Sequence, residues 1–208
     1  MSKLAISSQP TSMRDRILDA TERLLGRFGY QKTTMDDVAR EAGVAKRTIY
    51  MHFTGKEELA LSSIDRIVER LIERLEAIAS APQEPAERVK EMLRCRVLFR
   101  FDSVRDYHQS LDDLFESLRP AYMARRQQYF NAEAQVFASV LAAAKNARIF
   151  ELRDPVETAH TLLLATNALL PSSLSVQELG KRSAVEKKVG GIADLLVGGL
   201  RSRGSTRD

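Results

Sequence analysis

Apolar residues recur every three or four positions along almost the whole chain, and no segment alternates regularly between apolar and polar residues. The first spacing places apolar side chains on one face of an α-helix, whereas strict alternation is typical of a half-buried strand. The pattern therefore predicts an all-α fold with about nine helices and no sheet. The predicted helices cover approximately residues 12–28, 35–42, 46–53, 54–79, 85–101, 104–118, 120–144, 155–170 and 183–200.

Several predicted helix ends carry residues that commonly cap helices. Thr34 and Asp37 have the spacing of a capping box, in which each side chain accepts a hydrogen bond from the other residue's backbone. Gly43 follows the last apolar position of the same helix, where a residue with positive φ ends a helix without straining a Cβ atom. The same reasoning predicts helix starts at Thr54 with Glu57, at Asp154 with Pro155 and Glu157, and at Ser183 with Glu186.

The segment from Thr33 to Glu57 splits into two short predicted helices joined at a glycine. The second helix is expected to bury Ile49 and Phe53, which lie four residues apart on one face. Its other face carries Lys46, Arg47, Tyr50 and Met51, with Thr48 and His52 at the edges. Such a pair, with a basic exposed face on its second helix, is typical of a helix-turn-helix that enters the DNA major groove. On this pattern alone, an ordinary helical hairpin with solvated charges is an equally good interpretation.

The string GVAKRTIYMHFTGKEEL at residues 43–59 resembles the signature of the TetR family of bacterial transcriptional regulators. The signature positions are matched by Gly43, Val44, Ile49, Tyr50, His52, Phe53, Lys56, Glu57 and Leu59. The resemblance in sequence covers about residues 13–75. It implies a homodimer whose two recognition helices enter successive major grooves of a pseudo-palindromic double-stranded DNA operator. It also implies a C-terminal helical body that dimerises through its last two helices and often holds a small ligand.

The resemblance and the exposed polar face together predict the DNA-binding residues. Lys46 and Arg47 are expected at base edges or nearby phosphates, because arginine can bond bidentately to guanine. His52 and Lys56 resemble the family's phosphate contacts, and two threonines offer hydroxyls and amides at a helix N-terminus. The full set is Thr33, Thr34, Lys46, Arg47, Thr48, Tyr50, Met51, His52 and Lys56, with Arg14, Arg16 and Lys32 as flanking phosphate candidates.

Two positions depart from the family pattern. Ala45 stands where a serine or threonine cap is frequent, and a missing cap costs about 1 kcal/mol, so the second helix is expected to be looser off DNA. Met51 stands where a polar or aromatic residue is common. The operator sequence of a relative is therefore not expected to transfer to this chain.

The proline residues Pro82 and Pro85 interrupt the helical pattern and predict a domain boundary near residue 80. The polar segment 1–11 is expected to be a disordered tail. The predicted units are a DNA-binding domain at 12–72 with its helix-turn-helix at 35–54, a linking helix at 55–79, and a regulatory and dimerisation domain at 80–203.

The C-terminal part contains two further sets of candidate residues. Residues that could line an apolar ligand pocket are Cys95, Phe99, Tyr107, Phe115, Tyr122, Phe130 and Phe137. Plain core packing explains aromatic residues at helical spacing equally well. Arg96, Arg100, His108 and Glu133 lie among them and could orient a polar ligand, although most such groups are solvated. Candidates for a dimer interface are Ala159, Leu163, Thr166, Leu170, Ile192, Leu196 and Gly199.

Composition and motifs argue against a disulfide-linked protein, a metalloprotein and an enzyme. The 208 residues carry a net charge of +4 and one cysteine, Cys95, so no intrachain disulfide can form. His108, Asp112 and Glu116 share a predicted helical face that could hold a divalent metal, but such faces are usually solvated, so no metal and no cofactor are predicted. The three histidines are scattered and no phosphate-loop or nucleophile motif occurs, so no enzyme is predicted.

No stretch of the sequence approaches the roughly 20 apolar residues of a membrane span, and residues 1–11 lack an apolar core of signal-peptide length. A cytoplasmic protein without a membrane partner is therefore expected. The leading hypothesis is a dimeric repressor that an unknown small-molecule effector releases from its operator. Two alternatives remain: a ligand-independent regulator or activator, and a helical binding protein or enzyme without specific DNA binding, in which Lys46 and Arg47 would tolerate substitution.

Overall fold

The computed structural model describes residues 12–104, 111–173, 178 and 180–201 of the chain. Within these ranges every regular element is a helix, apart from one isolated bridge between Phe150 and Arg201. The helices are α1 (Met13–Lys32), α2 (Met35–Ala42), α3 (Lys46–Tyr50), α4 (Lys56–Ala79), α5 (Pro85–Val104), α6 (Leu111–Asn146), α7 (Pro155–Asn167), the 3-10 helix η2 (Pro171–Ser173) and α9 (Arg182–Leu200). The predicted all-α fold class is confirmed.

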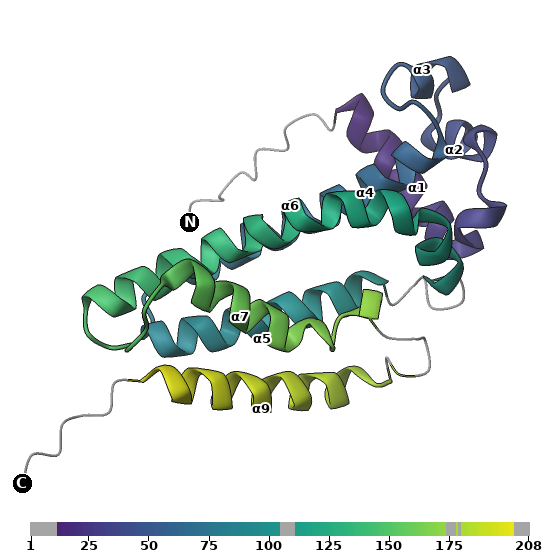
Figure 1. Cartoon of the computed structure of the whole chain (residues 1–208). Helices are drawn as coiled ribbons and strands as arrows, with labels where there is room; N and C mark the ends of the chain where they lie inside the picture. The colour runs from purple at the N-terminus through teal and green to yellow at the C-terminus, as the bar shows by residue number, and fades with distance from the viewer. Residues whose placement is uncertain (1–11, 105–110, 174–177, 179, 202–208) are drawn as a thin grey trace, which may run out of the picture.

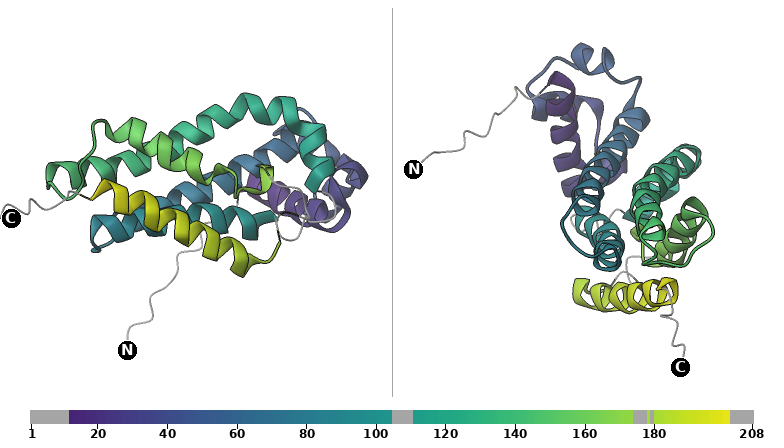
Figure 2. Two further views of the ribbon diagram at one scale, coloured as in Figure 1. Left: turned by 60° about the horizontal axis from the view of Figure 1, so that its bottom comes forward. Right: turned by 90° about the vertical axis from the view of Figure 1, so that its left-hand side faces the viewer.

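The first three helices gather at one end of an elongated helical body (Figure 1). The long helices α4 and α6 connect this end with the body, where α6 packs on α7 and α5 packs on α9. Helix α9 lies at the outer edge of the body, with one side against α5 and the opposite side uncovered (Figure 2). Helix α3 therefore lies at one end of the molecule, and the uncovered side of α9 lies on the body, away from α3.

Separate apolar clusters hold the two parts of the molecule. The N-terminal cluster includes Ile17, Leu18, Val38, Ile49, Phe53 and Leu59. The body is built around a larger cluster that includes Leu71, Leu93, Phe137, Leu141, Leu163 and Val197. A smaller cluster of Leu25, Ala60, Leu61, Leu118 and Tyr122 joins α1, α4 and α6. The end of the molecule that carries α3 is thus packed against the same two helices that run into the body.

The local signals of the helix-turn-helix are confirmed. The Asp37 amide donates to the Thr34 hydroxyl at 3.2 Å, and the Thr34 amide donates to the Asp37 carboxylate at 3.1 Å. Gly43 ends α2 with φ 66°, in the left-handed region that favours glycine. Asp154 likewise caps α7, with Pro155 as the first helical residue. These features depend only on residues a few positions apart.

Two of the predicted caps are wrong. Helix α4 begins at Lys56 after an extended Gly55, so Thr54 is one residue too early to cap it and no side chain does so. Helix α9 begins at Arg182 after Lys181, which places Ser183 inside the helix rather than at its cap. In both places the path of the chain, rather than the capping pattern, determines where the helix starts.

The predicted break at Pro120 is also absent, because α6 runs without interruption from Leu111 to Asn146. Proline removes one backbone donor from a helix and usually bends or ends it. Here the neighbouring side chains Leu118 and Tyr122 are both buried against α1 and α4, and this packing outweighs the local preference. The two helices predicted on either side of Pro120 are therefore one, and the described ranges contain eight α-helices instead of nine.

Candidate DNA-binding surface and C-terminal cavity

Helix α3 is held in place by two fully buried side chains. Ile49 and Phe53 pack into the N-terminal cluster against α1 and α2, as their spacing predicts. The Arg14 guanidinium lies 5.4 Å from the centroid of the Phe53 ring, on the outer side of this contact. The N-cap residue Ala45 provides no side-chain hydrogen bond, as expected from its methyl group. The orientation of α3 therefore depends on packing rather than on its own cap.

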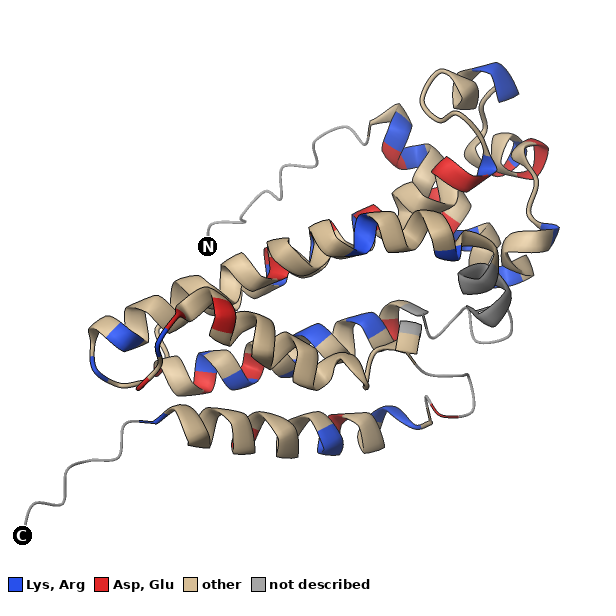
Figure 3. Ribbon diagram, viewed as in Figure 1, with Lys and Arg blue, Asp and Glu red and all other residues tan. Residues whose placement is uncertain are grey.

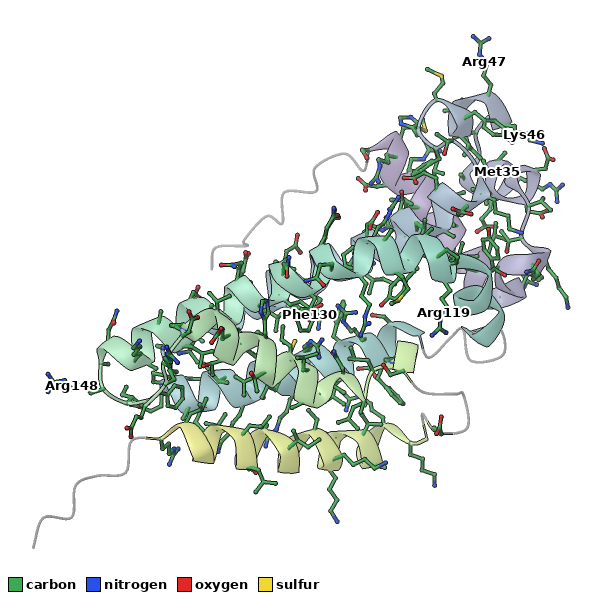
Figure 4. The ribbon with its side chains drawn as sticks, in the orientation of Figure 1. Met35, Lys46, Arg47, Arg119, Phe130 and Arg148 are labelled. Carbon is green, nitrogen blue, oxygen red and sulfur yellow. The ribbon has the colours of Figure 1, made fainter. Side chains whose placement is uncertain are left out.

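The opposite face of α3 is exposed and carries the predicted recognition residues. Arg47 points away from the molecule at its extremity (Figure 4), and Tyr50 and Met51 are 50% and 76% exposed. His52 is exposed beside them, and Thr48 is half-buried. The exposed side chains combine a cation, a phenol and a thioether. Such a set can reach phosphates, guanine edges and thymine methyl groups.

Lys46 has a partner that the sequence analysis missed. Its ammonium donates to the carboxylate of Asp36 on α2 at 2.8 Å, and this hydrogen bond raises the pKa of Lys46. The acidic patch on α2 lies next to the basic tip of α3 (Figure 3). Both side chains are exposed, so the ion pair is open to exchange with a phosphate. Lys46 is therefore charged but not unpartnered in the absence of DNA.

Other predicted phosphate contacts are already engaged inside the protein. Thr33 is buried, and its hydroxyl donates to the Gly29 carbonyl at 2.7 Å, so the expectation of a free hydroxyl there is wrong. The Thr34 hydroxyl is likewise bonded to Asp37. Lys56 donates to the Gln31 carbonyl at 3.2 Å, and burial lowers the pKa of Lys56. The flanking Arg16 donates to the carbonyl of Ala42, at the end of α2.

The predicted ligand-binding residues do not form one pocket. Phe137 is fully buried in the core of the body, and Cys95 and Phe99 pack at the edge of the same core. Arg74 covers Phe99, with its guanidinium carbon 4.7 Å from the ring centroid. Tyr107 and the side chain of Phe115 lie outside the described residues. Only Tyr122 and Phe130 of the set border a common cavity.

That cavity lies between α5, α6 and the end of α7. Its lining consists of Arg96, Arg100, Tyr122, Arg126, Tyr129, Phe130, Glu133, Asn167 and Leu170. Its empty volume is about 280 Å³ when the open solvent at its mouth is included, and only a small part of this volume is enclosed by the protein.

An ionic network forms the polar wall of the cavity. Glu133 is 1% exposed and lies between the guanidinium groups of Arg96 and Arg100, with ion pairs to both. Arg96 is 2% exposed and also donates to Thr166 and Asn167 on α7, at 2.9 and 2.8 Å. Burial lowers the pKa of Arg96, while the negative charge of Glu133 opposes this shift. The expectation that these groups are mostly solvated is therefore wrong for Arg96, Arg100 and Glu133, and His108 lies outside the described residues.

A second polar cluster connects α6 to α4 beside the cavity. Arg125 bonds Asp65 and donates to Glu58 at 2.7 Å, and the Tyr129 hydroxyl donates to Asp65. Burial, followed by the hydrogen bond to Asp65, raises the pKa of Tyr129. Tyr129 also lines the cavity. The cavity wall therefore contacts the helix that leads to the DNA-binding end, a connection that no pattern in the sequence indicated.

Four of the predicted dimer-interface residues are inside the protomer. Ala159, Leu163, Thr166 and Leu170 are buried against the body's own helices, so the prediction that they contact a second copy is wrong. Ile192 and Leu196 are half-buried, and Gly199 is exposed. The most exposed large apolar side chains of α7 and α9 are instead Leu164, at 61%, and Leu195, at 80%. The four buried residues lie on the core-facing side of their segment, whereas Leu164 and Leu195 lie on the solvent-facing side.

Metal and membrane features are absent from the part of the chain that the structure describes. No three histidine, cysteine, aspartate or glutamate residues there are grouped so that they could hold a metal ion. His108 and the side chains of Asp112 and Glu116 lie outside the described residues. Among the described helices, none combines the length and the apolar character needed to cross a membrane.

Comparison with known proteins agrees with this geometry. The family model described as "Bacterial regulatory proteins, tetR family" matches residues 17–62. An uncharacterized HTH-type transcriptional regulator of Bacillus subtilis, YhgD, is 37% identical over 100 residues, which are 48% of this chain and 50% of that protein. The HTH-type transcriptional repressor KstR of Mycolicibacterium smegmatis is 36% identical over 80 residues, 38% of this chain and 39% of that protein.

The chain matches YhgD and two further Bacillus subtilis regulators over about half of their length or less. The likeness in fold extends further. The crystal structure of a transcriptional regulator from Cytophaga hutchinsonii superposes with a TM-score of 0.75 at 17% identity, over 89% of this chain and 97% of that chain. The helix-turn-helix, its matched sequence and the all-helical body agree with one another, and residues 17–62 match the DNA-binding region of the TetR family of bacterial regulatory proteins.

Proposed function

We propose that the protein is a sequence-specific DNA-binding transcriptional regulator that acts as a homodimer. The observation that carries the proposal is the exposed outer face of α3, with Arg47, Tyr50 and Met51 directed to solvent. Ile49 and Phe53 fix that face by packing on the inner side. A two-fold dimer would place two such helices in successive major grooves about 34 Å apart. Lys46 and His52 extend the same surface toward the phosphates.

The dimer is proposed to form through the exposed faces of α7 and α9. Leu164 and Leu195 are large apolar side chains that remain exposed in the protomer. Gly191, Gly198 and Gly199 lie on the exposed side of α9, where a Cβ atom would meet nothing within 4 Å at any of the three. Small residues let a partner helix approach closely, and the two leucines provide apolar area to bury. A Leu195→Glu variant is expected to sediment as a monomer, whereas Glu at the exposed position of Met123 on α6 should leave the dimer intact.

Regulation is proposed to occur by repression and release. The related KstR carries the name of a repressor. Here the cavity in the body shares Tyr129 with the contact between α6 and Asp65 of α4. A ligand that displaces Tyr129 would alter how α6 holds α4, and α4 leads directly to the helix-turn-helix. In a dimer, a small rotation of each α4 changes the distance between the two recognition helices.

The test is binding of the purified protein to genomic DNA fragments, with random DNA as competitor and at several salt concentrations. A regulator is expected to retain a few fragments and to give a palindromic footprint on each. Arg47→Ala is expected to weaken operator binding about tenfold or more and random-DNA binding much less, because a bidentate contact to guanine contributes about 1–3 kcal/mol of discrimination. Arg148→Ala is the matched control, since Arg148 is exposed at the far end of the body (Figure 4).

Two outcomes would favour the alternatives. Equal loss on operator and random DNA would make Arg47 a phosphate contact only. Uniform binding that salt abolishes, together with tolerance of substitutions at Lys46 and Arg47, would favour a helical binding protein or enzyme without specific DNA recognition. Specific binding that no small molecule releases would favour a ligand-independent regulator or an activator.

A further inference from the structure

We propose that the cavity between α5, α6 and α7 binds a small molecule in which one carboxylate is attached to a short apolar or aromatic body. The proposal deepens the proposed function, because it names the chemical class of the effector at the site that borders Tyr129. Its physical basis is the composition of the cavity wall, which has a polar side with an excess of positive charge and an apolar side.

The charges that line the cavity do not balance. Three guanidinium groups, those of Arg96, Arg100 and Arg126, face one carboxylate, that of Glu133. Glu133 pairs with Arg96 and Arg100, which leaves one positive charge in excess in the buried part of the wall. Arg126 at the exposed rim forms no ion pair with any residue in the described ranges. An anion is therefore attracted to the cavity, and a cation is repelled from it.

One donor in this wall lacks an acceptor. The Nε atom of Arg100 is buried and has no hydrogen-bond partner among the described residues, although the other end of the same guanidinium bonds Glu133. Buried polar groups are nearly always hydrogen-bonded, and an orphaned donor calls for an explanation. A carboxylate is an acceptor-only group with two oxygens, so it can bond Arg100 and Arg126 together.

The remaining wall is apolar. Phe130, Tyr122 and Leu170 contribute ring and aliphatic surface, and the Tyr129 hydroxyl is already bonded to Asp65, so Tyr129 presents mainly its ring. Phe130 is supported from behind by His160, whose ring is stacked on it with centroids 5.2 Å apart. This surface favours a hydrocarbon or aromatic body over a sugar or a nucleotide, which would need more acceptors and donors.

The size of the ligand is limited by the same residues. The enclosed part of the cavity is small, so a ligand must displace a side chain at the rim. Arg126 is exposed, which makes it the side chain at the rim that can move at the lowest cost. A single ring or a short chain bearing a carboxylate is the body that fits such an opening.

The test titrates three probes with the same phenylpropyl carbon skeleton into the purified protein in the absence of DNA. These are 3-phenylpropionate, its neutral amide and 3-phenylpropan-1-amine, each titrated by calorimetry and repeated with the phenylacetate and phenylbutyrate series. The carboxylate is expected to bind about tenfold or more tightly than the amide, because a hydrogen bond to a charged group is about twice as strong as a neutral one. The amine is expected not to bind.

Substitutions at the rim locate the site. Arg126→Gln and Arg100→Gln are each expected to lower carboxylate affinity about tenfold, which is about 1.4 kcal/mol, and to leave amide affinity unchanged. Arg126 is exposed, so its variant should fold normally, and Arg148→Gln is the matched control on the same helical body. Equal affinity for acid and amide, no binding of any acid in the series, or unchanged binding in Arg126→Gln and Arg100→Gln would each overturn the proposal.

A DNA-release experiment separates this proposal from the proposed function. A carboxylate that binds in calorimetry but releases no DNA would leave the cavity assignment intact and contradict the repressor mechanism. A regulator that binds its operator but fails every carboxylate titration would keep its DNA-binding function and lose the anion site. The two failures are therefore distinguishable.

Discussion

The contact that caps α2 at the DNA-binding end and the ionic network of the helical body span different distances along the sequence. At the DNA-binding end the contact that starts α2 is local, because Thr34 and Asp37, which bond each other, are three residues apart. In the body, Glu133 pairs with Arg96 across 37 residues of sequence, and Arg96 reaches Thr166 across 70. The first kind of contact forms as soon as its helix forms. The second kind exists only when three helices have come together.

The polar side chains of the two parts are buried to different extents, so the two parts should tolerate substitutions differently. Thr34, Asp36 and Lys46 at the DNA-binding end are exposed, so water can replace the contacts of each at a small cost. Arg96 and Glu133 are almost completely buried, and a buried charge without its partner costs several kcal/mol. Single substitutions are therefore expected to have graded effects at the DNA-binding end and large effects in the body.

Glu133→Gln is expected to have the largest effect. It leaves Arg96 and Arg100 side by side without their shared anion, and breaking a buried ion pair in this way costs about 3–5 kcal/mol. The measurement is urea unfolding followed by circular dichroism at fixed protein concentration. The exposed Glu151→Gln should change the free energy of unfolding by less than about 0.5 kcal/mol. If both variants behaved alike, the network in the body would be no more important than a surface charge.

Gly43→Ala is expected to have the largest effect at the DNA-binding end. Gly43 has φ 66°, and an added Cβ would meet only the end of the Arg16 side chain at 3.8 Å, so strain comes from the backbone and not from a clash. The left-handed conformation costs an L-residue about 1–2 kcal/mol. Gly43→Asn is the matched control, because asparagine tolerates this region better and should lose less stability in the same unfolding experiment. An equal loss in both variants would point to a steric cause instead.

Thr34→Ala is expected to have a smaller effect, because it removes one capping hydroxyl at the start of α2. Such caps contribute about 1 kcal/mol, whereas Thr54→Ala should cost less than about 0.5 kcal/mol, since Thr54 caps no helix. Thermal unfolding of the two variants checks the difference. A similar loss from both would mean that the sequence pattern, and not the observed geometry, describes the start of α4.

The same capping box predicts a dependence on pH. The hydrogen bond from the Thr34 hydroxyl lowers the pKa of Asp37 below its ordinary value of 3.8. A lowered pKa in the folded state contributes stability that is fully present above the ordinary value and is lost as the pH falls through the folded-state value. The difference in stability between the wild type and Thr34→Ala should therefore shrink below about pH 4. A difference that stayed constant down to pH 2 would contradict the role of the Asp37 carboxylate.

The range of the contacts also explains what the sequence could predict. Ile49, Phe53, Thr34 and Gly43 act within a few residues of their neighbours, so their spacing was sufficient to identify the helix-turn-helix and its exposed face. Thr54 has an equally good capping pattern but lies one residue before the start of α4, because Gly55 continues the extended path of the chain. A local pattern identifies a turn more reliably than it identifies which residue ends it.

Packing between helices that are distant in sequence determines the structural features that the sequence pattern did not predict. Pro120 remains inside α6 because Leu118 and Tyr122 are buried on helices that are distant in sequence. Arg96 and Glu133 looked like ordinary polar positions, since nothing in their neighbourhood shows that α5 and α6 bring them together. Leu163 and Leu164 are adjacent, and only the packed structure shows that the first is core and the second is surface.

The smallest effect on stability is expected from Asp36→Asn, which tests an exposed ion pair on the proposed DNA-binding surface. The ion pair between Asp36 and Lys46 is exposed, so its loss should leave the unfolding transition almost unchanged. It should nevertheless tighten DNA binding about two- to threefold, because it frees Lys46 for a phosphate and removes a carboxylate from an anionic surface. Since phosphate contacts carry no sequence information, the gain should be equal on operator and random duplexes and should diminish at high salt.

Asp194→Asn is the control for this measurement, because the exposed Asp194 pairs with the half-buried Lys90 in the body at 3.0 Å, almost the same length. Fluorescence anisotropy with labelled duplexes at several salt concentrations compares the two variants. Only Asp36→Asn should change DNA affinity. If neither did, Lys46 would lie outside the DNA interface, and recognition would rest on Arg47, Tyr50 and Met51. A gain confined to the operator would instead place Lys46 at a base edge, so that one exposed ion pair would limit specificity as well as affinity.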